Sequence, residues 1–304
     1  MQALDRRGWA AQESLLSHRV LSFNEDQMTW GCAQNDETEE RFASSARPRH
    51  AKHIELIVET LRQPMCENFH RSDWAGFTKS YSAREVTYET DTFPAISGVV
   101  QKVQQSTGDI YYAGLWKQHF LEGLLWCLEM GMGSRQRMEG HPRAPRRRQE
   151  WIAPSWSWAS IKGDVRYSYK VSKSGYCARL EEYCVICSGL DPFGALTADF
   201  ARITGPITLV TDVPTEDEVA MGRDSRYMIR LGNGTLALAT VRFDFVHSVS
   251  CSALMITPTL DVCIEKVEQT TNTYVRIGIV TVWDSPVHGL TVSDHVPSRS
   301  IILV

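Results

Sequence analysis

The sequence predicts an α+β protein with an N-terminal helical part that carries a small β-hairpin, followed by a β-rich sandwich or open barrel. Apolar residues recur at helical spacing in several stretches before residue 130, and a series of short alternating segments follows residue 151. A third observation marks the junction of the two parts. Residues 153–160 place Trp156 and Trp158 at alternate positions among small residues, as on one face of an extended strand.

The first 33 residues contain a short helical segment and a predicted hairpin. Residues 9–17 place Trp9, Leu15 and Leu16 on one helical face. Residues 19–23 and 27–32 are strand candidates, and the polar cluster between them favours a tight turn. Because an isolated hairpin is barely stable in water, we expect this one to pack on another part of the protein.

Residues 34–150 form the predicted helical part, which begins with a polar loop at 34–50. Helices are expected at 53–62, 69–81 and 91–108. The strongest helical pattern covers residues 116–130, whose wide apolar stripe indicates burial on two sides. The stripe consists of Trp116, Phe120, Leu121, Leu124, Leu125 and Leu128, with Trp126 beside it.

A loop rich in glycine, proline and arginine is expected at residues 131–150. Its second half contains Arg143, Arg146, Arg147 and Arg148. Such a run is usually a solvated connector, and the alternative is a site for an anion or a protein partner.

Residues 151–304 form the β-rich part, which is expected to pack on the helical part through the Trp156 and Trp158 junction. Strands are expected at 165–171, 176–188, 199–210, 227–231, 235–245, 253–267, 274–282 and 301–304. The composition of 231–234 and 269–272 indicates hairpin turns, and Gly205-Pro206 indicates a bulge or bend. A series of this kind is typical of a sandwich or an open barrel.

Composition limits the functions to be considered. The chain has 304 residues, 43 % hydrophobic and 22 % charged, as in a globular protein. Its net charge of -4 argues against nucleic-acid binding through a basic surface. No apolar run is long enough for a membrane span, and the N-terminus lacks a signal-peptide core. The eight cysteines fit a reducing, cytoplasmic compartment in which they stay unpaired.

Motifs for metal, cofactor and nucleophilic chemistry are absent from the sequence. Cys184 and Cys187, with Cys177 nearby, resemble half of a zinc site, but no second pair of ligands follows. We therefore expect buried structural cysteines and no bound metal. The chain also lacks a Gly-x-Ser-x-Gly elbow and the glycine-rich loops that bind nucleotides, so no cofactor is expected.

Five residues near the junction form a candidate pocket. Trp116, Trp156 and Trp158 would line it, and His119 with Glu122, three positions apart on a helix, would supply an acid and a base. A cleft of aromatic rings between two layers suits an apolar small molecule. The alternative is that the tryptophans are core residues and that His119 and Glu122 belong to a polar helix face.

The segment Arg7-Gly8-Trp9-Ala10-Ala11-Gln12-Glu13, which leads to Leu16-Ser17-His18-Arg19, is the first of a series of motifs. The series continues at residues 23–32, 81–87, 91–98, 112–116 and 124–126, and it ends at 153–160. In this order the motifs resemble the C-terminal two-thirds of fungal heterokaryon-incompatibility (HET) domain proteins. The family's first HET-domain blocks are absent, so residues 1–33 resemble a remnant of the domain's end.

The resemblance implies a protein of fungal self/non-self recognition that binds a protein partner and is not an enzyme. Because the first HET-domain blocks are missing, it also implies a degenerate relative of the family. A second hypothesis belongs to another class. The aromatic junction suits a small-molecule-binding protein or a cofactor-independent cyclase or isomerase of fungal secondary metabolism. This second hypothesis requires an apolar cavity near Trp116 and Trp158.

Overall fold

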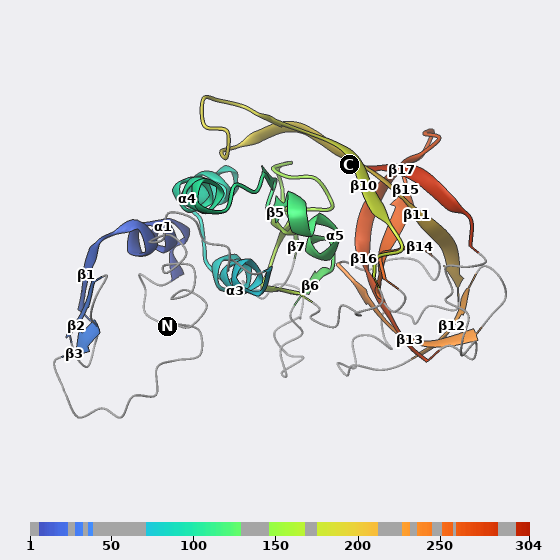
Figure 1. Cartoon of the computed structure of the whole chain (residues 1–304), viewed down its shortest axis with the longest axis horizontal. Helices are drawn as coiled ribbons and strands as arrows, with labels where there is room; N and C mark the ends of the chain where they lie inside the picture. The colour runs from blue at the N-terminus through green and yellow to red at the C-terminus, as the bar shows by residue number, and fades with distance from the viewer. Residues whose placement is uncertain are drawn as a thin grey trace. The chain divides into compact units, whose positions relative to one another are not determined.

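The computed structural model describes residues 6–23, 28–32, 36–38, 71–128, 146–167, 175–211, 227–231, 236–244, 251–257, 260–284 and 296–304. The helix expected at 53–62 and most of the arginine-rich loop lie outside these residues. Contacts divide the chain into two compact units. The first unit comprises Met1–Ile110 with Gly189–Ala195, and the second comprises Tyr111–Ser188 with Leu196–Val304. Figure 1 shows the elements of both units.

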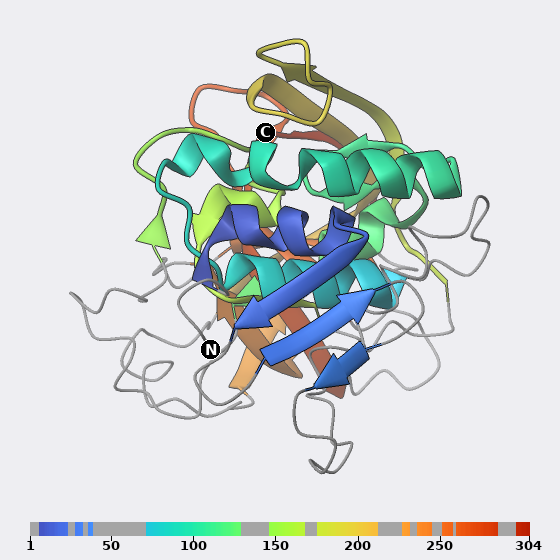
Figure 2. The same ribbon diagram turned by 90° about the vertical axis from the view of Figure 1, so that its left-hand side faces the viewer.

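The described helices of the first unit are α1 (Gly8–Leu16), α3 (Arg71–Ser82) and α4 (Ser97–Thr107), and two 3-10 turns, η2 (Glu89–Thr92) and η3 (Pro94–Ile96), precede α4. Helix α4 ends at Gly108, whose φ of 70° gives the left-handed cap that favours glycine. Strands β1 (Arg19–Phe23), β2 (Met28–Cys32) and β3 (Asp36–Thr38) form an antiparallel sheet in the order β1-β2-β3. Figure 2 shows the three strands side by side.

Two side chains of α1, Trp9 and Gln12, hold this helix against the segment before α4 and the first turn of α4. The indole N–H of Trp9 donates to Asp91 Oδ2 at 3.2 Å. Gln12 Oε1 accepts the backbone N–H of Gly98 at 2.7 Å, which satisfies a donor in the first turn of α4. These two motif residues therefore have structural roles within the first unit.

The predicted helix at residues 116–130 is wrong. Strands β4 (Tyr111–Tyr112) and β5 (Leu115–Trp116) pair in a tight hairpin, and the short helices η4 (Lys117–His119) and α5 (Phe120–Gly123) follow. The chain then extends as β6 (Trp126–Leu128), which pairs with β9 (Val165–Tyr167). Leu124, Leu125 and Trp126 are all fully buried. A buried strand and a buried helix have the same continuous apolar composition, so apolar spacing alone does not distinguish them.

The stretch 153–160 is not the extended strand that alternation predicted. The N–H of Ser157 donates to Pro154 O at 3.0 Å, and Ser157 Oγ accepts from Ala159 N at 3.1 Å, which opens the 3-10 turn η6 (Trp158–Ser160). Trp156 and Trp158 therefore do not share one face of a strand. Strand β8 (Ile161–Lys162) follows and pairs with β7 (Arg146–Arg147).

The longer strands of the β-rich part are β10 (Arg179–Cys187), β11 (Leu196–Thr211), β12 (Tyr227–Leu231), β13 (Leu236–Phe243), β14 (Cys251–Met255), β15 (Leu260–Lys266), β16 (Thr273–Asp284) and β17 (Ser298–Leu303). Five of them close into a barrel. Strand β11 pairs with β14, β14 with β15, β15 with β16 and β11 with β17, all antiparallel, and the parallel pair β16–β17 completes the ring. Strands β12 and β13 form a second bridge from β11 to β16.

The mostly β character of this part is confirmed, and with it the presence of both helices and strands in the chain. The barrel is closed, where the sequence predicted a sandwich or an open barrel. The β-rich part has a buried core cluster made mostly of small and β-branched residues. This cluster consists of Val210, Ala237, Ala239, Val241, Cys251, Ala253, Cys263, Ile277, Val280 and Val282.

Two strand predictions need correction. The single strand expected at 253–267 is two strands, because Thr257 Oγ1 accepts the N–H of Leu260 at 3.0 Å and the chain reverses between β14 and β15. Strand β11 runs through Gly205-Pro206, and its neighbour changes there from β10 to β14. A Cβ at position 205 would lie 2.8 Å from the Cβ of Ala178, so only glycine fits at this exchange of neighbours.

Candidate functional site

The three tryptophans of the candidate pocket are buried, and two of them pack against other aromatic rings. Trp116 meets Tyr111 edge to face, with ring centroids 5.2 Å apart. Trp156 packs on Phe120 with centroids 5.3 Å apart. Trp116, Trp156 and Trp158 are each at most 3 % exposed. Neighbouring rings thus occupy the surroundings of Trp116 and Trp156, as in an aromatic core.

Two indole N–H groups join residues 111–128 to residues 153–160. Trp158 Nε1 donates to Gly114 O at 3.0 Å, and Trp126 Nε1 donates to Trp156 O at 2.9 Å. Gly114 has a φ of 100°, and a Cβ there would lie 2.5 Å from Trp158 Nε1. The close approach of the indole and the turn conformation both require glycine at position 114.

The sequence analysis missed a buried arginine, Arg276, on the barrel strand β16. Its guanidinium carbon lies 3.5 Å from the centre of the Trp126 ring, and its Nε donates to Leu124 O at 3.1 Å. One terminal nitrogen forms an ion pair with Asp244, and the other donates to Trp126 O. The backbone N–H of Arg276 donates to Ser155 Oγ at 2.8 Å. This arrangement, which we call the Arg276 cluster, joins β16 to β6 and to the turn at 155–157.

The Arg276 cluster is a structural arrangement rather than a reactive one. Arg276 and Asp244 are both buried, and a buried guanidinium is tolerable only when its donors are used and its charge is balanced. The available sequence signal was a single arginine, Arg276, within the mostly apolar run of residues 274–282. Its partners lie up to 152 positions away in the chain, so the sequence did not indicate them.

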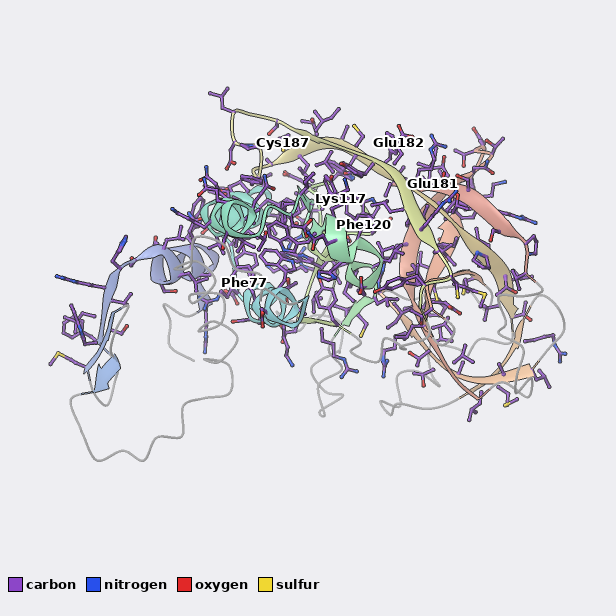
Figure 3. The ribbon with its side chains drawn as sticks, viewed as in Figure 1. Phe77, Lys117, Phe120, Glu181, Glu182 and Cys187 are labelled. Atoms are coloured by element: carbon purple, nitrogen blue, oxygen red, sulfur yellow. The ribbon has the colours of Figure 1, made fainter. Side chains whose placement is uncertain are left out.

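His119 and Glu122 do lie together, and Tyr176 joins them. His119 Nδ1 is 3.8 Å from Glu122 Oε1, and the Tyr176 hydroxyl donates to the same carboxylate oxygen. Figure 3 labels Lys117 and Phe120, which flank His119 on this segment. Burial alone would raise the pKa of Glu122, but the hydrogen bonds from His119 and Tyr176 outweigh it and hold this pKa below its usual range.

The chemistry available to these three residues is limited. A carboxylate held ionised by two donors orients its neighbours well, but it is a poor proton donor. The His119 side chain is 40 % exposed, and Tyr176 is also exposed, so the group lies at the surface of the second unit. The geometry fits a polar contact that ties residue 176 to α5.

Two other carboxyl groups lie in apolar surroundings. Burial raises the pKa of Asp199, on β11, to about 7, and its Oδ2 has no hydrogen-bond partner among the described residues. Asp199 pairs with Val185 across the β10–β11 ladder. Burial also raises the pKa of Asp261, on β15, well above its usual range. Neither residue is part of the candidate pocket.

Asp199→Asn is expected to change how stability depends on pH. Because the folded-state pKa of Asp199 is about 7 and lies above the unfolded value, ionisation destabilises the fold, and stability falls as pH rises from about 4 through 7. The variant loses this penalty and gains about 2 kcal/mol at pH 8, a value discounted for partial solvent exposure, with little gain at pH 4.

Urea unfolding of the full chain at pH 4.5 to 8, in steps, measures this difference. Glu268→Gln, which removes an exposed carboxylate, is the control, and its free energy of unfolding should stay within about 0.5 kcal/mol of wild type, as is usual for a surface substitution. An Asp199→Asn difference that stays constant over this range would contradict the assignment.

Six cysteines are free thiols: Cys127, Cys177, Cys184, Cys187, Cys251 and Cys263. Cys177, Cys184 and Cys187 are partly buried, as part of the β10 segment and the residues before it. Cys251 and Cys263 belong to the buried core cluster of the β-rich part, where burial and the hydrogen bond between the two thiols raise the pKa of the Cys263 thiol. Within the described ranges, no group of three or more His, Cys, Asp or Glu residues could hold a metal ion.

The arginine-rich loop is only partly described. Arg143 lies outside the described residues, and Arg146 and Arg147 form β7. Arg148 Nε donates to Ala159 O at 2.7 Å, which ties this end of the loop to the turn η6. Arg146 is exposed.

An exposed apolar face on the first unit was not anticipated. Leu21 pairs with Trp30, and Phe23 pairs with Met28, across the β1–β2 ladder, so all four share one face of the sheet. Their exposed fractions are 51 %, 38 %, 72 % and 40 %, respectively. Val20 and Ser22, on the opposite face of β1, are partly buried. The more apolar face therefore points to solvent, the reverse of the usual pattern. We call Leu21, Phe23, Met28 and Trp30 the hairpin face.

No family model, no curated protein and no solved structure matches the chain. In the part of the chain that the structure describes, no helix is long and apolar enough to cross a membrane. Functional inference for this protein therefore depends on its own residues and geometry.

Proposed function

We propose that this protein acts by binding another protein, as a HET-like component of fungal self/non-self recognition that is not an enzyme. The hairpin face carries the proposal. Aromatic residues, methionine and arginine are the types enriched at protein interfaces, and the face consists of Trp30, Phe23, Met28 and Leu21, with the exposed Arg19 at one end of β1. Contiguous exposed patches of this kind mark interaction sites.

The contacts of the tryptophans favour this role over small-molecule binding or catalysis. The second hypothesis needs an apolar cavity near Trp116 and Trp158. Trp116 instead meets the ring of Tyr111, and Trp158 lies against the β4–β5 turn with its N–H donated to Gly114 O. Free thiols throughout the described cysteines fit a role in the reducing cytoplasm.

Placing charges on the hairpin face tests the proposal. The double variant Leu21→Asp/Phe23→Asp is expected to abolish the effect of the wild-type protein on growth or hyphal fusion when it is expressed in a filamentous fungus. In pull-downs from fungal lysate, the double variant should no longer recover the partner protein that the wild-type protein recovers. Docking would bury the two introduced carboxylates without partners, which opposes binding.

Leu209→Asp is the matched control, because Leu209 is also a leucine on a strand and is likewise 51 % exposed. This control should behave as wild type in both assays. A wild-type protein that has no effect on growth or fusion and recovers no specific partner would contradict the proposed function. So would a double variant that keeps both properties.

A further inference from the structure

We infer that the hairpin face binds a single amphipathic helix of a partner protein, with an apolar stripe flanked by acidic residues. This inference rests on the proposed function and specifies its partner. The observations that carry it are the area of the face, the direction in which its side chains point, and the charge at its edge.

The area of the hairpin face suits one helix. Large side chains offer roughly 150–250 Å² each, so the four exposed fractions correspond to about 400 Å² of apolar surface. A stable interface between two folded proteins needs about 800 Å² on each side, which is twice this amount. The two cross-strand pairs are separated by two residues along each strand, which is a distance of about 7 Å. A single helix is about 10 Å wide, so one helix can cover both pairs.

The orientation of the side chains distinguishes a helix from an added strand. Among the described strands, β1 has a neighbour on one edge only. A strand that paired with its other edge would lie in the plane of the sheet, beside Leu21 and Phe23, and would leave their exposed surface uncovered. An element laid across the sheet removes that surface from water. Helix-on-sheet packing is the common way to bury an apolar sheet face.

The positive charge of Arg19 at the edge of the hairpin face indicates which charged residues the partner helix carries beside its apolar stripe. Arg19, Leu21 and Phe23 occupy alternate positions on β1, so Arg19 lies on the same face of the sheet as the other two. The Arg19 side chain is exposed. Among the described residues it forms no ion pair with a carboxylate. A helix that carries Asp or Glu beside its apolar stripe would pair with Arg19 when it docks, so we expect an acidic flank.

Three synthetic peptides of 18 residues test the inference on the full-length chain by fluorescence anisotropy at low salt. The first is an amphipathic helix with glutamate flanks, the second has the same apolar stripe with lysine flanks, and the third has alternating apolar residues and glutamates that favour a strand. We expect the first peptide to bind at least about 5-fold more tightly than the other two. Phe23→Asp should weaken its binding at least about 10-fold, and Leu209→Asp should leave it unchanged.

Arg19→Glu provides the charge-swap variant. It should reverse the preference, so that the lysine-flanked helix binds more tightly than the glutamate-flanked one. Tightest binding of the strand peptide, an unchanged preference in Arg19→Glu, or no binding by any peptide would overturn the inference. Sedimentation that shows a dimer lost in Phe23→Asp would overturn it too, because a second copy would then occupy the face.

Failure of this inference can be distinguished from failure of the proposed function. If no helical peptide binds but Leu21→Asp/Phe23→Asp still abolishes the effect on growth or fusion, the interaction role stands and only the helical partner is wrong. If that double variant behaves as wild type in the fungus, the interaction role fails as well.

Discussion

Arg276→Met is expected to lower the free energy of unfolding by about 3–5 kcal/mol, because it leaves Asp244 buried without its charged partner. The change also removes the guanidinium from the Trp126 ring and leaves the carbonyl oxygens of Leu124 and Trp126 without this donor. Methionine has nearly the volume of the arginine stem, so the loss reflects charge and hydrogen bonding more than a cavity. Urea unfolding of the full chain at pH 7 measures it.

Two further variants separate the contributions within the Arg276 cluster. Arg276→Lys keeps the positive charge but lacks the planar fork that reaches several acceptors, so an intermediate loss of about 1–3 kcal/mol is expected. Arg276→Met/Asp244→Asn removes both charges and should be more stable than Arg276→Met alone. A double variant no more stable than the single one would show that the unpaired carboxylate is not the cause.

Gly278→Ala is expected to destabilise the barrel by about 3 kcal/mol. A Cβ at this position would lie 2.3 Å from Arg242 O and 2.8 Å from the Cα of Phe243, which are backbone atoms of the neighbouring strand β13. Backbone atoms in a paired strand cannot move aside as a flexible side chain does, so the clash separates β13 from β16. The midpoint of urea or thermal unfolding measures the effect.

Gly189→Ala is the matched control for Gly278→Ala. A Cβ at position 189 meets no atom within 4 Å, and no positive φ restricts this residue. The unfolding midpoint of this control should lie within about 0.5 kcal/mol of wild type. Equal midpoints for the two glycine variants would contradict the close approach of β13 and β16.

The β-rich part was predictable because its strands are separated by turn residues and alternate clearly. The expected range 227–231 matches β12, and 274–282 lies within β16. Closure of the barrel was not predictable, because it depends on the parallel pairing of β16 with β17. The residue pattern of a strand does not indicate which distant strand it pairs with. The helix predicted at 116–130 failed for a related reason, since a fully buried strand has no polar face to reveal its period.

The burial of the three tryptophans was predictable from the sequence, but their arrangement was not. The sequence marked Trp116, Trp156 and Trp158 as large buried groups, and they are buried. It could not show that a turn at Ser157 separates the two indoles of residues 156 and 158. The hairpin face was visible as Leu21, Phe23, Met28 and Trp30 at alternate positions. Alternation does not tell which face of a sheet is covered, so the exposure of this face needed the structure.

The place of β17 in the barrel has a consequence for synthesis on the ribosome. Strand β17 is the last of the barrel strands in the chain, and it connects β11 to β16. Until residue 303 has emerged, β11 and β16 each keep an unpaired stretch of backbone that can join another nascent chain. The carbonyl of Val304 also accepts the N–H of Ser155 at 3.1 Å, so the turn beside Trp156 is completed only when the residue after β17 is in place. A chain that had not yet added β17 would therefore keep these stretches of β11 and β16 open to pairing with another chain.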